Sequence, residues 1–234
     1  LYICGIVAYI GDKTALPILI NGLRRLEYRG YDSAGVAILN NREFLSAKAV
    51  GKIDNLAAKI NGQDLAGTFG IAHTRWATHG GVTEPNAHPH ADCTGKIILA
   101  HNGIIENYRE LKGELGPSHT YKSETDSEVL AHLIEIYYKG DLRKAVLEAL
   151  SRVRGTYGLV VMHSDHLDTL IAARMGSPLV VGIGDNEYYI GSDTSPMLAY
   201  TKKVIFLDDG EVAEISRGQM NTVNLKDINV AKHV

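Results

Sequence analysis

The feature that most constrains the fold is a change in the spacing of apolar residues near Tyr157. After this point the chain carries only short strand-like runs. Helical patterns lie in separate blocks before this point, and no Gly/Ser-rich linker divides the 234 residues. Many short strands with segregated helices favour a single α+β domain with largely antiparallel sheets. The strands expected in this second half are 159–162, 169–172, 179–183, 188–190, 204–206 and 212–215.

The first half also contains strand patterns. The expected strands are 4–10, 35–39, 44–50, 67–74 and 96–100. The second and third of these flank Asn40 and Asn41, a pair typical of a tight hairpin turn.

Helical spacing of apolar residues predicts helices at 16–23 and 141–150. Thr14 is positioned to cap the first, and a Ser/Thr-x-x-Glu capping box at Thr125 predicts a third helix. The tail after Gly218 is polar and lacks a period. We therefore expect the domain to span residues 4–218, and residues 219–234 to be a linker stub.

Composition excludes several classes of protein. Hydrophobic residues make up 45% and charged residues 22%, and the net charge of −3 offers no basic surplus for nucleic acid or anionic lipid. No apolar stretch approaches the roughly 20 residues that span a bilayer. Two cysteines provide no disulfide framework, which suits a cytoplasmic protein. Because the first residue is Leu, we expect a processed chain or a fragment.

Cys4 is the first candidate for chemistry, because a cysteine so near the start of a chain suits a nucleophile that uses its own α-amine as base. An α-amine has a pKa of about 7.7–8.0 and a thiol one of about 8.5, so the two groups can exchange a proton. The alternative is a small buried residue at the start of a strand. Leu1, Tyr2 and Ile3 precede it, so Cys4 as written carries a peptide nitrogen.

A second candidate region is the long irregular segment 75–95, which begins inside the run HTRWATHG at 73–80. Arg75 is suited to grip a carboxylate through two parallel hydrogen bonds. Trp76 is either a lid over a site or a core anchor. The histidines of this region match no zinc spacing, and no paired cysteine supports a metal. They are His73, His79, His88 and His90.

Two further groups of candidate residues remain. One follows a predicted strand, and the other begins a predicted helix. Asn102 and Gly103 can aim a side-chain and a backbone N–H at one oxyanion, although Asn-Gly is also a common turn. Asp126 lies where the helix dipole favours an acid, and there it can also pair with an ammonium group. Glutamine needs a cation, an anion, a nucleophile and oxyanion donors, and Arg75, Asp126, Cys4 and Asn102/Gly103 supply that set.

Five runs then identify a family. They are CGIV at 4–7, RLEYRGYDSAG at 25–35, HTRWATHG at 73–80, HNGIIEN at 101–107 and SETDSE at 123–128. Together they resemble the glutaminase domains of the glucosamine-6-phosphate synthases, which are class II glutamine amidotransferases. The resemblance extends from Cys4 to about Gly218 and implies an N-terminal-nucleophile fold, a four-layer α/β/β/α sandwich with two stacked antiparallel sheets.

The resemblance also implies roles for individual residues. Cys4 attacks the glutamine amide, and Asn102 with Gly103 forms the oxyanion hole. Arg75, with Thr78 and His79 nearby, binds the α-carboxylate, and Asp126 binds the α-ammonium. Trp76 belongs to a loop that closes over the substrate, and Arg29 supports the surroundings of the nucleophile. These residues are Cys4, Arg29, Arg75, Trp76, Thr78, His79, Asn102, Gly103 and Asp126.

The implied reaction yields L-glutamate and ammonia from L-glutamine and uses no metal, nucleotide or organic cofactor. The implied partners are C-terminal sugar-isomerase domains, which convert fructose 6-phosphate to glucosamine 6-phosphate in what we expect is a homodimer. Two alternatives stay open: an inactive glutamine-binding or regulatory module with a blocked Cys4, and a glutaminase domain that serves another acceptor.

Overall fold

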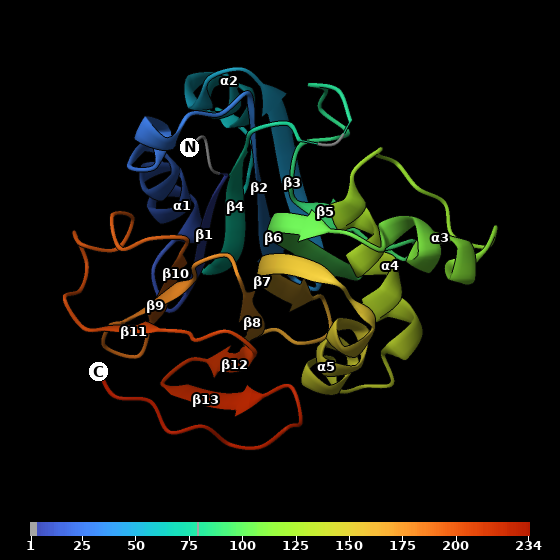
Figure 1. Ribbon diagram of the computed structural model, residues 1–234. Helices are drawn as coiled ribbons and strands as arrows, with labels where there is room; N and C mark the ends of the chain where they lie inside the picture. The colour runs from blue at the N-terminus through green and yellow to red at the C-terminus, as the bar shows by residue number, and fades with distance from the viewer. Residues whose placement is uncertain (1–3, 79) are drawn as a thin grey trace.

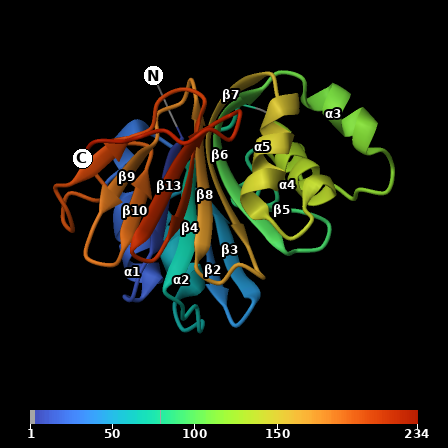
Figure 2. The ribbon, with the colours of Figure 1, turned by 90° about the horizontal axis from the view of Figure 1, so that it is seen from below.

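The computed structural model describes residues 4–78 and 80–234. Two sheets pack face to face, and helices cover the outer face of each, so the molecule has four layers in the order α/β/β/α (Figures 1 and 2). All pairings between the named strands are antiparallel. The predicted α+β sandwich is confirmed.

The first sheet has the strand order β11-β9-β10-β1-β4-β2-β3, so the strand that follows Cys4 is central. Helices α1 (Ala15–Arg24) and α2 (Ile53–Ile60) pack on its outer face, and the short 3₁₀ helix η1 (Glu27–Arg29) follows α1. The strands are β1 (Gly5–Ile10), β2 (Ser33–Asn40), β3 (Glu43–Val50), β4 (Phe69–Arg75), β9 (Val180–Ile183), β10 (Tyr188–Gly191) and β11 (Val204–Phe206).

The second sheet has the order β13-β12-β8-β7-β6-β5. Its outer face is covered by α3 (Tyr108–Leu115), α4 (Asp126–Tyr137) and α5 (Leu142–Arg152). The strands are β5 (His90–Ala91), β6 (Ile97–Ile105), β7 (Gly155–His163), β8 (Thr169–Met175), β12 (Glu211–Ser216) and β13 (Gln219–Asn224).

Three apolar cores separate the four layers, and β1 shows how one strand serves two of them. Val7 and Tyr9 point toward α1 and α2, whereas Ile6, Ala8 and Ile10 lie in the core between the sheets. Every residue of β1 is buried. A strand covered on both faces is apolar throughout, which explains why this run lacks the alternation of a half-exposed strand.

The structure shifts one predicted turn and excludes a second turn that was an alternative reading. The β2–β3 hairpin turns at Asn41 and Arg42, both with positive φ, because Asn40 still pairs with Glu43. A turn at Asn102-Gly103 does not form, because β6 continues through these residues and pairs with β7 as far as Ile105.

The structure also extends the sheet beyond Gly218. Residues 219–224, expected in the linker stub, form β13, which pairs with β12 along its whole length. The polar sequence of this strand gives only a weak apolar period: Thr222 and Val223 are buried, and the other members are partly or fully exposed. The boundary at 218 therefore falls inside a hairpin, and a linker function for the remaining residues stays a prediction.

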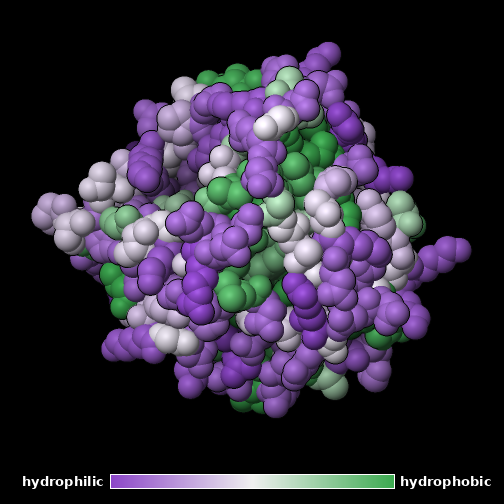
Figure 3. Space-filling model, turned by 180° about the vertical axis from the view of Figure 1, so that it is seen from behind, coloured by the Kyte–Doolittle hydropathy of each residue, from purple (hydrophilic) through white to green (hydrophobic). Residues whose placement is uncertain are grey.

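The surface is mainly hydrophilic on the face opposite to that of Figure 1, with hydrophobic residues in smaller groups (Figure 3). Within the described part of the chain, no helix has the length and apolar character needed to cross a bilayer.

Candidate active site

Cys4 lies immediately before β1, and the sheet register places it beside the end of β4. Gly5 pairs with Thr74, so Cys4 faces the residues that follow Thr74. The N–H of Trp76 donates to Cys4 Sγ at 3.2 Å, and the thiol donates to the Trp76 carbonyl at 3.6 Å. The pairing of β1 with β4 and the backbone of Trp76 directly after β4 therefore fix the position of the sulfur.

Burial raises the pKa of the Cys4 thiol, and the Trp76 N–H and the Arg75 charge offset this only in part. The thiolate is the nucleophilic form of cysteine. Because the raised pKa keeps the thiol protonated near neutral pH, attack by Cys4 requires a base that removes its proton.

Six of the predicted site residues line one small pocket with Cys4 as a member. The predicted residues in this pocket are Cys4, Arg75, Trp76, Thr78, Gly103 and Asp126. Its remaining lining residues are His88, His101, Thr125 and Ser127. Residues from these scattered motifs therefore line one pocket, and the role of each residue stays a prediction.

Arg75 ends β4 with its side chain buried, at 4% exposure for the residue. Its guanidinium donates to the carbonyls of Gly81 at 3.1 Å and Gly80 at 3.5 Å. Asp32 orders the chain on the other side, because its N–H donates to the Arg75 carbonyl at 2.8 Å and its Oδ2 accepts from Ala77 N at 2.6 Å. A buried cation held in this way is suited to an anionic group of a ligand.

Asp126 brings a negative charge to the same pocket from the first turn of α4. Thr125 caps this helix as predicted, and its Oγ1 accepts from Glu128 N at 3.3 Å. Asp126 is 4% exposed, and its Oδ2 accepts from Ile105 N at 2.7 Å. The carboxylate is therefore fixed by β6 as well as by its own helix. The other half of the capping box does not form, because the Glu128 carboxylate accepts from Lys122 N and Ser123 N instead.

Asn102 lies behind the sulfur and connects the two sheets. Its Nδ2 donates to the Cys4 carbonyl at 3.0 Å, and its Oδ1 accepts from His73 Nε2 at 2.8 Å. Gly103 follows with φ of 133°, and a Cβ there would lie 2.1 Å from the Thr156 carbonyl. Only glycine fits this position. The proposed oxyanion role of Asn102 and Gly103 stays a prediction.

Arg29 does not reach the pocket of Cys4. It forms an ion pair with Asp193 at 3.1 Å and donates to Ser192 Oγ at 3.4 Å, in a separate pocket. Ser192 Oγ in turn accepts from Ile6 N at 3.1 Å. Arg29 is therefore linked through Ser192 to the start of β1, and its support of the surroundings of Cys4 stays a prediction. His79 lies outside the described residues.

Sequence reasoning missed the role of a group of buried histidines, of which His88 and His101 line the pocket and the others lie behind it. Burial lowers the pKa of each, to about 3 for His73, so they are neutral near pH 7. The rings of His73 and His88 stack at 4.1 Å. His101 donates from Nε2 to the Thr156 carbonyl at 3.1 Å, and its Nδ1 contacts Ser127 Oγ at 2.7 Å. The group consists of His73, His88, His90 and His101.

Comparison with known proteins identifies the family of this chain. A family model described as a glutamine amidotransferase domain matches residues 40–230. Curated relatives include a glutamine–fructose-6-phosphate aminotransferase (isomerizing) of Thermus thermophilus, 51% identical over 95% of this chain and 37% of the relative. The enzyme of the same name from Pyrococcus horikoshii is 49% identical over 96% of this chain and 38% of the relative.

Solved structures give the same fold. A glutamine phosphoribosylpyrophosphate amidotransferase from B. subtilis has a TM-score of 0.80 at 26% identity, over 95% of this chain and 49% of that one. A glutamine aminotransferase class-II domain protein from Silicibacter pomeroyi has a TM-score of 0.63 at 17% identity, over 94% and 99% of the two chains. At that identity, the second comparison supports the fold alone.

The fold and the sulfur-centred pocket define a class II amidotransferase domain of the N-terminal-nucleophile type. The chain belongs to the glutamine amidotransferase domain family. The predicted resemblance to the glutaminase domains of glucosamine-6-phosphate synthases is confirmed by the relatives. The chain spans less than two fifths of the length of these relatives, at 37% and 38%.

Proposed function

We propose that this chain hydrolyses L-glutamine to L-glutamate and ammonia through a γ-glutamyl thioester on Cys4. The observation that carries the proposal is the meeting of Cys4, Arg75 and Asp126 in one pocket. A nucleophile, a buried cation and a buried anion there match the side-chain amide, the α-carboxylate and the α-ammonium of glutamine.

The reaction proceeds in two displacements. The free α-amine of Cys4 takes the thiol proton, and the sulfur adds to the amide carbon. The resulting oxyanion is stabilised by the Asn102 side chain and the Gly103 N–H, and the amine returns the proton to the leaving nitrogen, so that ammonia departs. Water then attacks the thioester with the same amine as base, and glutamate and the free thiol are released.

Arg75 binds the α-carboxylate, with Thr78 in the same pocket, and Asp126 binds the α-ammonium. Only about 20 Å³ of the pocket is open to the centre of a water molecule, which is too small for glutamine. Trp76 forms the solvent-facing part of the wall, because its side chain is among the exposed large hydrophobic ones, at 38%. Opening of this segment admits the substrate, and its closure excludes water during acyl transfer.

The acceptor of the ammonia is proposed from the relatives. Their name implies transfer to fructose 6-phosphate, and their greater length leaves room for sugar-isomerase domains beyond the part that this chain matches. The glucosamine 6-phosphate product, the dimeric state and the cytoplasmic location belong to this proposal. Reconstitution with those domains and fructose 6-phosphate tests it.

A second function is favoured by one observation. Leu1, Tyr2 and Ile3 precede Cys4, so the sulfur of the untrimmed chain has no α-amine as base. In that form the protein is a glutamine-binding module with little or no turnover, since its thiol pKa is raised.

The deciding experiment compares two proteins, one that begins at Cys4 and one that retains the three residues, with both masses verified by mass spectrometry. Ammonia release from glutamine is measured for each. We expect turnover in the first and at most a trace in the second, because only the first has the amine. Equal activity would contradict the role of the amine, and inactivity of both folded proteins would favour the binding module.

A further inference from the structure

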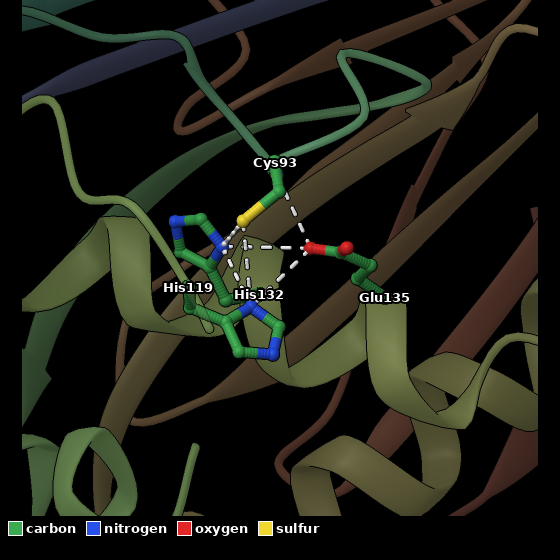
Figure 4. A group of neighbouring side chains, drawn as sticks. All are labelled: Cys93, His119, His132 and Glu135. Carbon is green, nitrogen blue, oxygen red and sulfur yellow. Dashed lines mark hydrogen bonds and ion pairs between the residues drawn. The ribbon is translucent and has the colours of Figure 1, made fainter. Parts of the chain in front are cut away.

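A second cluster of chemically reactive side chains lies away from the pocket of Cys4. It consists of Cys93, His119, His132 and Glu135, which point toward a common centre (Figure 4). Each contributes one ligand atom, and these four atoms lie within 4.8 Å of one another. None of the four lines the pocket around Cys4.

Three separate segments build this cluster. Cys93 lies in the loop between β5 and β6, and His119 lies in the connection from α3 to α4. His132 and Glu135 are three residues apart on α4, so they share one face of that helix. His132 is buried, while Cys93 is exposed, so the cluster has a closed base and an accessible side.

Five of the six ligand–ligand distances match the edges of a tetrahedral metal site, and the sixth, from Cys93 Sγ to Glu135 Oε2, is within 4.8 Å. His119 Nδ1 and His132 Nδ1 are 3.2 Å apart, and Cys93 Sγ lies 3.5 Å from the first and 3.3 Å from the second. Glu135 Oε2 lies 3.5 Å from each of the two nitrogens. With metal–ligand bonds of about 2.0–2.3 Å, the edges of a tetrahedron measure about 3.3–3.6 Å.

Hydrogen bonds alone pair the polar atoms of this cluster poorly. Two imidazole nitrogens face each other, and at most one of a facing pair can donate while the other accepts. Both also face a thiol, which is a weak hydrogen-bonding group. A thiolate, a carboxylate and two neutral imidazoles carry two negative charges in total, so a divalent cation neutralises the set.

The surroundings hold the ligands in place. The backbone N–H of Cys93 donates to Glu135 Oε2 at 3.1 Å. On the far side of the His132 ring, Nε2 lies 3.6 Å from Glu128 Oε1, and both side chains are almost fully buried. A carboxylate behind a metal-binding histidine orients the ring and increases its basicity, which is a common feature of metal sites.

We propose that Cys93, His119, His132 and Glu135 form a structural Zn²⁺ site. Zinc is favoured because it accepts sulfur, imidazole and carboxylate ligands in tetrahedral geometry, and four protein ligands close the coordination shell. The ion ties the loop of Cys93 and the connection of His119 to α4, the helix that begins at Asp126. The proposal departs from the expectation that the protein uses no metal. The histidines weighed for a metal there were His73, His79, His88 and His90, and none of them belongs to this set.

The test uses the whole chain after treatment with a chelator. Zn²⁺ is titrated against a chromophoric competitor, and we expect one equivalent bound per chain. Co²⁺ is then used as a spectroscopic probe, with the expected result a sulfur-to-cobalt charge-transfer band together with the visible bands of a tetrahedral site. Absence of stoichiometric binding to the folded wild-type protein overturns the proposal.

Matched variants assign the ligands. Cys93→Ala should lose the charge-transfer band, whereas Cys4→Ala should keep it, and His166→Ala should still bind one equivalent. If Cys93→Ala does not fold by circular dichroism, His119→Ala replaces it and should lose stoichiometric zinc binding. A band that survives Cys93→Ala or disappears in Cys4→Ala refutes the site. These readouts are independent of glutamine turnover, so the site and the proposed function can fail separately.

Discussion

The two cysteines of this protein lie in surroundings that use the same residue types in opposite ways. Around Cys4, neutral histidines are turned toward protein partners, such as Asn102 for His73 and Thr156 for His101. Around Cys93, the histidine nitrogens are turned toward the sulfur and toward each other. Proximity of cysteine and histidine is therefore a poor guide to function, and the direction in which each nitrogen points distinguishes a rigid wall from a set of ligands.

The elements that position the two cysteines also differ. Cys4 is placed by the register of the central strand against β4, and Asn102 connects its carbonyl to the other sheet. Cys93 is placed by a loop against one helix. A nucleophile needs a position fixed relative to its substrate, whereas a metal can itself fix the segments that bind it.

The largest expected effect separates the two cysteines by activity. Cys4→Ala should lower glutamine hydrolysis by at least about 10⁴-fold, as removal of a nucleophile does in other hydrolases. Cys93→Ala should lower it by less than about tenfold, because that thiol is outside the pocket. Ammonia release measures both, and circular dichroism checks the fold. Similar losses in the two variants would break the distinction.

Removal of the metal should affect the thermal stability of the two cysteine variants differently. Saturation at 100 times the dissociation constant stabilises a protein by about 2.7 kcal/mol. Chelation of zinc should therefore lower the Tm of the wild-type protein by roughly 5–10 °C. The same chelator should leave the Tm of Cys93→Ala unchanged, while Cys4→Ala should respond like the wild type. Thermal melts with and without chelator decide the matter, and an equal response in Cys93→Ala argues against the metal site.

The cation of the glutamine pocket offers a smaller effect. Arg75→Lys should raise the KM for glutamine about tenfold, or about 1.4 kcal/mol, because a point charge replaces a two-pronged donor. The kcat should change less, since the substituted group is remote from the amide. Arg24→Lys is the matched control, because Arg24 forms an exposed pair with Asp54. An unaltered KM in Arg75→Lys contradicts the assigned role.

The smallest effect concerns pH. Burial lowers the pKa of His90 well below 6.5, so the unfolded chain binds a proton there that the folded chain does not. The stability that His90 contributes is complete above pH 6.5 and is lost as the pH falls toward its folded pKa.

His90→Gln should therefore make the unfolding free energy less sensitive to acid, by about 1.2 kcal/mol between about pH 7.0 and 5.5. Glutamine keeps a polar group near Thr125 Oγ1, which lies 3.0 Å from His90 Nε2. Urea titrations at the two pH values provide the measurement. An identical pH dependence in the variant means that His90 is protonated in the folded protein.

Local patterns in the sequence were sufficient for much of the fold. The apolar run of β1 and the Thr125 cap of α4 depend on neighbouring residues only, and both were found. The continuation of β6 through Asn102-Gly103 was missed, because a usual turn pair is held in a strand by β7. Strand β13 was missed for a similar reason, since its polar sequence is held by pairing with β12.

The functional residues also differ in whether a local sequence pattern could predict them. Residues of the Cys4 pocket lie in short recognisable runs, so their meeting could be predicted from the sequence. The place of Arg29 in a separate pocket could not, because it depends on its pairing with Asp193. In the Cys93 cluster only His132 and Glu135 carry a local signal, since they are three residues apart on α4, and Cys93 and His119 join them only through packing.

Helix α4 contributes residues to both the pocket of Cys4 and the cluster of Cys93. Asp126 stands at its first residue and His132 six residues later, about 9 Å along the axis. One helix that carries a residue of each proposed site gives a physical route by which the two occupancies can influence each other. Whatever factor zinc applies to the affinity for glutamine, glutamine must apply to the affinity for zinc.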